Sequence, residues 1–195
     1  MQAARVGLFG GSFDPPTIAH SFAARWALEK LELDQVWWIP ARLNPLKQDR
    51  RVSPVERRLE LVESIVARDE TFRVETCELE RDGLSYTVDT LTYLQSRHPD
   101  IHFILLLGSD TVQEFHRWHR IDEIFSLVDV VVLKRAGYEP GIDESDWRDR
   151  IRLLEFPCMD ISSTMVRERC AAGRPVHDLV PGDVNRLIQR HGLYR

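Results

Sequence analysis

Residues 10–20 read GGSFDPPTIAH, and they connect an apolar run to a segment with helical periodicity. The run, Arg5–Phe9, is typical of a strand that is buried on both faces of a parallel sheet. Two glycines follow it, where we expect the backbone to turn sharply and leave room for a ligand. Apolar residues then recur at helical spacing, namely Ala19, Phe22, Ala23, Trp26, Ala27 and Leu31. This spacing predicts a helix that begins near Pro16–Ala19 and buries an apolar stripe.

The first turn of this predicted helix contains His20. Unpaired backbone amides and the positive end of the helix dipole favour an anion there, and an imidazole adds another hydrogen-bond donor. A lone histidine would more often be an ordinary surface residue. Two glycines, Asp14, a double proline and His20 in one strand-to-helix connection favour a phosphate site instead. The glycine spacing matches neither GxGxxG nor GxxxxGK[ST], which disfavours a hydride-transfer fold and a P-loop.

The size and composition of the chain favour one compact domain over residues 1–195. Its net charge of -5 disfavours a nucleic-acid surface, so we expect a small anionic ligand held by a local cluster of donors. The sequence contains no signal peptide and no apolar run long enough to span a membrane, which predicts a cytoplasmic protein. Cys77, Cys158 and Cys170 lack CxxC or Cys/His spacing, which argues against a disulfide framework and a zinc site.

Strand and helix patterns alternate along the rest of the chain. Strands are predicted over Asp34–Pro40, Phe72–Thr76, Ile101–Leu107, Val128–Leu133 and Leu153–Phe156, and helices over Val52–Arg68, Thr87–Ser96, Ser163–Ala172 and Asp183–His191. Ser53, Pro54 and Glu56 predict a capping box at the start of the first of these helices. The segment Ala136–Asp149 contains Gly, Pro and acidic residues, which predicts a surface loop.

This alternation predicts an α/β fold, with a single Rossmann-like, doubly wound parallel sheet and helices on both faces. We expect the C-terminal helices, over about residues 163–191, to pack on the sheet. Ligands of such sheets bind beyond the carboxyl ends of the strands. Gly10, Pro40, Gly108 and Arg135 all fall just past predicted strand ends, so they mark the expected site.

A second candidate anion site lies in residues 161–169, which read ISSTMVRER. Ser162 or Ser163 can cap a helix, and Thr164 lies in its first turn. Arg167 follows Ser163 by four residues, so hydroxyls, amides and a guanidinium can converge on one phosphate. Taken alone, the segment is equally well an ordinary helix start. Together with the glycine turn, it predicts a second anion site that faces the first.

Five motifs along the chain resemble those of the bacterial nicotinate mononucleotide adenylyltransferases, a family of the nucleotidylyltransferase superfamily, and they follow the same order. The stretch GGSFDPPTIAH is similar to that family's GGTFDPxHxGH, and ISSTMVR at 161–167 is similar to ISSTxIR. The other matches are NPLK at 44–47 with PPHK, SYTVDT at 85–90 with SYTxDT, and GSD at 108–110 followed by Trp118 with GxD and a tryptophan. LVPGDV and GLY, near the end of the chain, are also similar to the family's ending. The resemblance covers nearly the whole chain.

The resemblance implies transfer of the adenylyl group of ATP to nicotinate mononucleotide, with Mg²⁺ bound to ATP and pyrophosphate released. It implies that ATP is bound by Gly10, Gly11, Ser12, Thr17, His20, Gly108, Asp110, Ser163, Thr164 and Arg167, and that His20, Lys47 and Arg167 are catalytic. It also implies that Tyr86 and Thr87 offer backbone amides to the nicotinate carboxylate, that Trp118 stacks on the pyridine ring, and that Arg135 contacts a phosphate of the acceptor. No side-chain metal site is expected, and neither a nucleic acid nor a membrane is an expected partner.

Each of these residues also has a plain alternative. Tyr86 and Trp118 are consistent with ordinary core or surface aromatics, Thr87 with a helix cap, and Lys47 with a solvated loop charge. The chain also departs from the family pattern at Thr17, Ala19 and Leu46. Two alternatives therefore stay open, namely another acceptor such as nicotinamide mononucleotide, and a catalytically weak nucleotide-binding module. The sequence is also compatible with a homo-oligomer.

Overall fold

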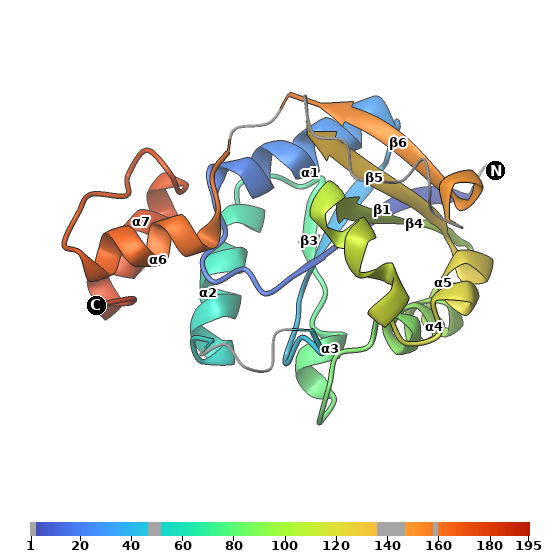
Figure 1. Ribbon diagram of the computed structural model, residues 1–195, viewed down its shortest axis with the longest axis horizontal. Helices are drawn as coiled ribbons and strands as arrows, with labels where there is room; N and C mark the ends of the chain where they lie inside the picture. The colour runs from blue at the N-terminus through green and yellow to red at the C-terminus, as the bar shows by residue number, and fades with distance from the viewer. Residues whose placement is uncertain (1–2, 47–51, 136–146, 158–159) are drawn as a thin grey trace.

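The computed structural model describes residues 3–46, 52–135, 147–157 and 160–195, without the side chain of Arg135. Six parallel strands form one sheet in the order β3-β2-β1-β4-β5-β6 (Figure 1). The strands are β1 (Ala4–Gly11), β2 (Gln35–Pro40), β3 (Phe72–Val74), β4 (Ile101–Gly108), β5 (Asp129–Arg135) and β6 (Ile151–Phe156). The helices are α1 (Ile18–Lys30), α2 (Val55–Val66), α3 (Cys77–Glu80), α4 (Thr87–Arg97), α5 (Ile121–Leu127), α6 (Ser163–Ala171) and α7 (Gly182–His191), with 3-10 turns η1 (Ser109–Arg117) and η3 (Arg148–Arg150).

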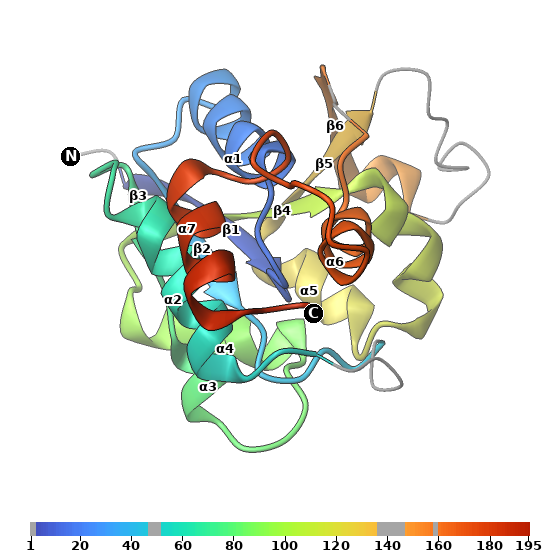
Figure 2. The same ribbon diagram turned by 90° about the vertical axis from the view of Figure 1, so that its left-hand side faces the viewer.

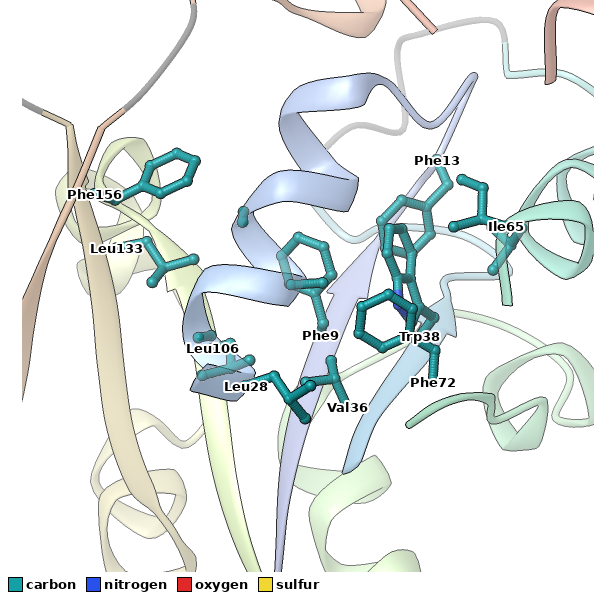
Figure 3. Close-up of a cluster of buried hydrophobic side chains, with 14 of the residues drawn as sticks. Phe9, Phe13, Leu28, Val36, Trp38, Ile65, Phe72, Leu106, Leu133 and Phe156 are labelled. Carbon is teal, nitrogen blue, oxygen red and sulfur yellow. The ribbon is translucent and has the colours of Figure 1, made fainter. Parts of the chain in front are cut away.

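The sheet has two buried faces because side chains alternate along each strand. On β2, Val36 and Trp38 belong to one core cluster, whereas Trp37 and Ile39 belong to the other. The first cluster also contains residues of α1, α2, α6 and α7, and the second contains residues of η1, α4 and α5. Figure 3 shows the first cluster, in which Phe9 of β1 and Trp38 lie near each other. The prediction of a Rossmann-like sheet with helices on both faces is therefore confirmed.

The glycines after the first predicted strand belong to that strand. Gly10 and Gly11 pair with Ile39 and Pro40 of β2, so β1 does not turn where the sequence analysis expected. The backbone turns later, at Phe13, whose φ of 47° lies in the left-handed region. A Cβ added at Gly11 would lie 3.0 Å from the Phe13 ring, whereas one at Gly10 would meet nothing within 4 Å. Lack of space beside the Phe13 ring therefore explains Gly11, whereas the described residues around Gly10 leave room for a side chain.

The predicted capping box at Ser53 is wrong. Helix α2 begins at Val55, with Pro54 as N-cap and without a side-chain cap hydrogen bond. The backbone amide of Ser53 instead donates to Oδ2 of Asp14 at 3.1 Å, so a tertiary contact replaces the local cap. Helix α4 and strands β2, β4 and β5 begin within one residue of their predicted starts. Most of the predicted surface loop Ala136–Asp149 lies outside the described residues.

The two C-terminal helices lie on the side of the sheet that the first core cluster covers. Helix α7 packs against α2, and the start of α6 contacts the loop that follows β1 (Figures 1 and 2). Val166 of α6 and Val184 and Ile188 of α7 extend the first core cluster. This position leaves the start of α6 facing the strand ends. In the described part of the chain, no helix is long and apolar enough to cross a membrane.

Candidate active site

A crevice opens between the carboxyl ends of β1 and β4. The connection that leaves β1 covers one face of the sheet and the connection that leaves β4 covers the other, so the two diverge at this point. A cavity of about 370 Å³ lies there, and we call it the first cavity. Its lining includes Gly10, Gly11, Ser12, His20, Gly108, Asp110, Ser163, Thr164 and Arg167. The structure thus brings together nine of the ten residues assigned to ATP.

The two predicted anion-binding segments are in direct contact, although they lie at opposite ends of the chain. Ser163 Oγ donates to the carbonyl of Pro15 at 2.8 Å, and Arg167 Nη1 donates to the carbonyl of Asp14 at 2.8 Å. Ser162, rather than Ser163, caps α6 by accepting from the amide of Met165. Ser163 is therefore available to fix the loop, and the start of α6 faces the first cavity.

His20 is held by the residue that caps its own helix. The Thr17 hydroxyl accepts from the His20 amide, and the Thr17 amide donates to His20 Nδ1 at 3.0 Å. The pair forms a capping box in which histidine takes the place usually held by Glu or Gln. Thr17 is fully buried and is not among the residues that line the first cavity. Thr17 therefore orients His20 from beneath, and it is the one residue of the ten assigned to ATP that does not line this cavity.

This arrangement also fixes the proton of the His20 ring. A backbone N–H can only donate, so Nδ1 must accept from Thr17, and the ring proton lies on Nε2. The Thr17 hydroxyl lies 2.7 Å from the same Nδ1 atom. The His20 ring packs edge-on to Phe13, with ring centroids 5.6 Å apart, and it lines the first cavity. His20 is thus built to present Nε2–H as a neutral hydrogen-bond donor.

Gly108 and Asp110 form a close pair at the end of β4. A Cβ at Gly108 would lie 2.6 Å from Asp110 Oδ1, which is too close for any real side chain. Glycine therefore allows the Asp110 carboxylate to fold back over the strand end. Asp110 is exposed and lines the first cavity and a second one beside it.

The second cavity, of about 440 Å³, shares a wall with the first. Both are lined by Gly10, Gly11, Asp110 and Thr111. On its far side lie residues of the loop after β2, the start of α4 and the end of η1, including Pro45, Leu46, Ser85, Tyr86, Thr87, Trp118 and His119. The residues assigned to the acceptor, Arg135 excepted, therefore gather in a cavity of their own. Among the described residues, the four of the shared wall are the ones that line both cavities.

The start of α4 is arranged like an anion site. Tyr86 is the N-cap and Thr87 the first helical residue, and no side chain caps this end of the helix. The ring of Tyr86 lies against His119, with centroids 4.7 Å apart. Trp118 packs edge-on against Phe115, and its Nε1 is buried without a hydrogen-bond partner among the described residues. Because no side chain caps α4, the alternative in which the Thr87 hydroxyl caps this helix is excluded.

A buried carboxyl group, Glu78, also lines the second cavity. Burial raises the pKa of Glu78, and hydrogen bonds from Thr90 and Ser85 and the charge of Arg81 oppose that shift. The Thr90 hydroxyl donates to Glu78 at 2.8 Å and accepts from Arg81 at 2.5 Å. Ser85 and Thr90 both belong to the SYTVDT motif, so this network ties α3 to the start of α4.

Three other positions that the sequence singled out do not line the first cavity or are not described by the structure. Leu46, which replaces a histidine of the family pattern, lines the second cavity rather than the triphosphate side. Lys47 lies outside the described residues. Arg135 is the last residue of β5 and pairs with Phe156, a residue of the first cavity, so its backbone lies away from the acceptor side.

Several residues that line the two cavities were not predicted from the sequence. Thr111 lines both cavities, Val52 and Phe156 line the first, and Glu78 and His119 line the second. Thr111 and His119 directly follow recognised motifs, so extending each motif by one residue could have found them. Val52, Phe156 and Glu78 reach the site only through tertiary packing, and no local pattern marks them.

The residues that the structure describes contain no cluster of three or more His, Cys, Asp or Glu side chains that could hold a metal ion. Cys77 and Cys170 are free cysteines. Burial and two neighbouring carboxylates raise the pKa of Cys77 to about 12, so it stays a protonated thiol.

Known proteins resemble this chain over almost its whole length. The cytidylyltransferase-like family model matches residues 8–169. A "Probable nicotinate-nucleotide adenylyltransferase" of Salinibacter ruber is 45% identical over 190 residues, which cover 97% of this chain and 97% of that protein. A protein of the same name from Halalkalibacterium halodurans is 39% identical, with 98% of this chain and 91% of that protein covered. The chain belongs to the cytidylyltransferase-like family and, within it, to the nicotinate-nucleotide adenylyltransferases.

The fold has solved counterparts as well. The structure of the Plasmodium falciparum nicotinic acid mononucleotide adenylyltransferase complexed with NaAD superposes with a TM-score of 0.81. The match covers 98% of this chain and 97% of that one at 20% sequence identity. At this identity, the likeness supports the fold, and the site must be argued from this chain's own residues.

Proposed function

We propose that this chain transfers the adenylyl group of ATP to nicotinate mononucleotide, giving nicotinic acid adenine dinucleotide and pyrophosphate. The observation that carries the proposal is the pair of cavities that meet at Gly10, Gly11, Asp110 and Thr111. One nucleotide in each cavity would bring an acceptor phosphate and the α-phosphate of ATP together at this shared wall. The two relatives, each named "Probable nicotinate-nucleotide adenylyltransferase", support the same reaction.

The reaction needs positioning more than it needs a base. The second pKa of a nucleotide phosphate is about 6, so the attacking oxygen is largely ionised at neutral pH. That oxygen forms a bond to the α-phosphorus while the bond from this phosphorus to the bridging oxygen breaks, and pyrophosphate leaves. Negative charge then gathers on the non-bridging and leaving oxygens. Fixed donors directed at those oxygens lower the barrier, because they are already oriented when the charge appears.

The first cavity supplies such donors from both ends of the chain. His20 offers Nε2–H from α1, and Arg167 offers a guanidinium held in place by the Asp14 carbonyl and, at 3.0 Å, by the Thr164 hydroxyl. The amides at the start of α6 add the positive end of a helix dipole. We assign the α-phosphate and the leaving pyrophosphate to these groups.

Mg²⁺ enters with ATP as part of the substrate. The ion prefers oxygen ligands, keeps several waters and commonly binds through substrate phosphates with one or two carboxylates. The first cavity fits this chemistry, because its exposed carboxylate, Asp110, lies at the wall shared with the acceptor. When bound, the ion neutralises charge on the phosphate oxygens.

The acceptor is assigned to the second cavity. The amides at the uncapped start of α4 suit the nicotinate carboxylate, since an anion is favoured at this end of a helix. Trp118 lies in the same cavity and offers an aromatic face to the pyridine ring. A carboxamide gains less from these amides than a carboxylate does, because it carries no charge. The geometry therefore favours the acid over nicotinamide mononucleotide.

The test is an assay of the purified protein with Mg²⁺-ATP and each mononucleotide, scored for dinucleotide and pyrophosphate. We expect pyrophosphate release only when an acceptor is present, and a higher kcat/KM with nicotinate than with nicotinamide mononucleotide. Faster turnover with the carboxamide would refute the acceptor assignment. Binding of ATP without any turnover would instead establish the weak nucleotide-binding module.

A further inference from the structure

Tyr194, in the segment that follows α7, contacts the loop of residues 12–17 between β1 and α1, although it lines neither cavity. Its hydroxyl donates to Asp14 Oδ1 at 2.8 Å, across 180 positions of sequence. The residue belongs to the GLY motif, to which the reaction assigns no role. Tyr194 also has a φ of 66°, a left-handed conformation that is unfavourable for a residue with a side chain. Such an outlier persists only where surrounding contacts hold it.

Asp14 is the point at which the contacts of the loop converge. The residue is only 5% exposed and lines the first cavity. Its Oδ1 accepts from Tyr194 and its Oδ2 accepts from the amide of Ser53. Its backbone carbonyl accepts from Arg167, which is one of the proposed phosphate donors. The carboxylate therefore has a donor on each oxygen, and the main chain of the same residue holds a catalytic guanidinium.

A buried arginine, Arg58, adds hydrogen bonds that hold the same loop. Arg58 is 1% exposed and donates to the carbonyls of Ser12, Ala41, Arg42 and Ser53 at 2.6–3.1 Å. Burial lowers the pKa of Arg58, whereas the charge of Asp14 opposes the shift. The loop between β1 and α1 is thus tied to the end of β2 and to the approach to α2. Tyr194 ties the segment that follows α7 to the same loop, in addition to the contacts made by Ser163 and Arg167 of α6.

We propose that Tyr194 is a positioning residue for adenylyl transfer, acting through Asp14 to hold the 12–17 loop and Arg167 in their reactive arrangement. The inference rests on the proposed function. Burial and the neighbouring Asp14 raise the pKa of Tyr194, so the hydroxyl keeps its proton and remains a donor at any working pH. Without that donor, Oδ1 of Asp14 loses its partner in a nearly buried place, and the loop can relax toward other arrangements.

The experiment compares Tyr194→Phe with a matched control, Tyr93→Phe, whose side chain is 38% exposed on α4 and lines neither cavity. We expect Tyr194→Phe to lower kcat about tenfold and to weaken binding of a non-hydrolysable Mg²⁺-ATP analogue several-fold. The KM for the acceptor should stay within twofold, because the second cavity is untouched. Tyr93→Phe should match the wild type in all three measurements.

A double-mutant cycle with Asp14→Asn shows whether Tyr194 acts through Asp14. We expect the two losses in kcat to be strongly non-additive, because groups in one network couple. Additive losses, or wild-type kcat and nucleotide affinity in Tyr194→Phe, would overturn the proposal. If Tyr194→Phe does not fold, Asp14→Asn alone must lower kcat while sparing the acceptor KM, and a wild-type kcat in that variant refutes the proposal. A wild type without turnover would instead refute the proposed function, whereas the ratio of analogue affinities still tests the role of Tyr194.

Discussion

His20 combines two roles that a substitution can separate. One ring nitrogen closes a capping box with Thr17, and the other carries the proton offered to the first cavity. Glutamine is a regular member of capping boxes at this helix position. The variant His20→Gln should therefore keep the helix start while removing the ring N–H.

We expect His20→Gln to unfold close to the wild-type temperature and to lose roughly 10² in kcat, the usual effect of removing one donor to a developing charge. His20→Ala should lose both the activity and about 1 kcal/mol of stability, since it removes the cap partner as well. Steady-state kinetics and thermal unfolding measure the two effects. The exposed His177, which lines neither cavity, provides the control His177→Ala. A wild-type kcat in His20→Gln would remove this residue from the mechanism.

Substituting either of two neighbouring glycines with alanine should affect the stability of the fold differently. Both glycines line the two cavities, but a Cβ at Gly10 meets nothing within 4 Å, whereas one at Gly11 lies 3.0 Å from the Phe13 ring. Gly10→Ala should change the free energy of unfolding by no more than about 0.5 kcal/mol and lower kcat/KM for both substrates. Gly11→Ala should destabilise the fold by about 1–3 kcal/mol through overpacking. Denaturant titration with initial-rate kinetics tests this, and equal destabilisation by both variants would contradict it.

At the scale of secondary-structure elements, helix α4 and the end of η1 build the acceptor side together. Trp118 follows η1 and lies in the second cavity but not in the first. Trp118→Ala should raise the KM for the acceptor about tenfold or more, because loss of an aromatic contact costs about 1–3 kcal/mol for a stacked base. Binding of ATP, followed by calorimetry, should stay within twofold. Equal loss of affinity for both nucleotides would contradict the division into two cavities.

The network beneath α4 makes the stability of the fold depend on pH. Because the pKa of Glu78 is raised from its usual 4.5 in the folded chain, the folded state keeps this proton to higher pH than the unfolded chain does. The stabilisation is complete below pH 4.5 and is lost as the pH rises through the raised value. Glu78→Gln has no such proton to lose. Its unfolding free energy should therefore fall less than that of the wild type between pH 4.5 and neutrality.

Denaturant titrations at several pH values measure this difference. Glu80→Gln, on the exposed side of the same short helix α3, provides the control and should follow the wild-type pH profile. Parallel profiles of the wild type and Glu78→Gln would show that the buried carboxyl does not contribute to the pH dependence.

At the scale of the whole molecule, much of the sheet could be predicted because strands buried on both faces leave continuous apolar runs, such as IHFILLL at 101–107. The ends of strands were harder, since Gly10 and Gly11 continue β1 only because they pair with β2. The short α3 and α5 were missed, because one or two turns carry no clear periodicity. The position of α7 on α2 depends on tertiary packing that no local pattern records.

The candidate site, too, could be predicted from the sequence only in part. Motif residues such as His20 and Arg167 meet in one cavity because the carboxyl ends of parallel strands share one edge of the sheet. The role of Thr17 could not be predicted, because a threonine that caps a helix and one that binds phosphate look alike in sequence. Tyr194 and Asp14 are 180 positions apart, and only the folded chain shows that they touch.

In the proposed reaction, one nucleotide occupies each cavity and the joined phosphates lie at the shared wall. A crystal structure of this chain with nicotinic acid adenine dinucleotide bound would locate all three parts at once. We expect the adenylyl half in the first cavity, the nicotinate half between Trp118 and the start of α4, and the phosphates beside Gly10 within reach of His20 and Arg167. Both halves in a single cavity, or phosphates remote from these residues, would contradict it.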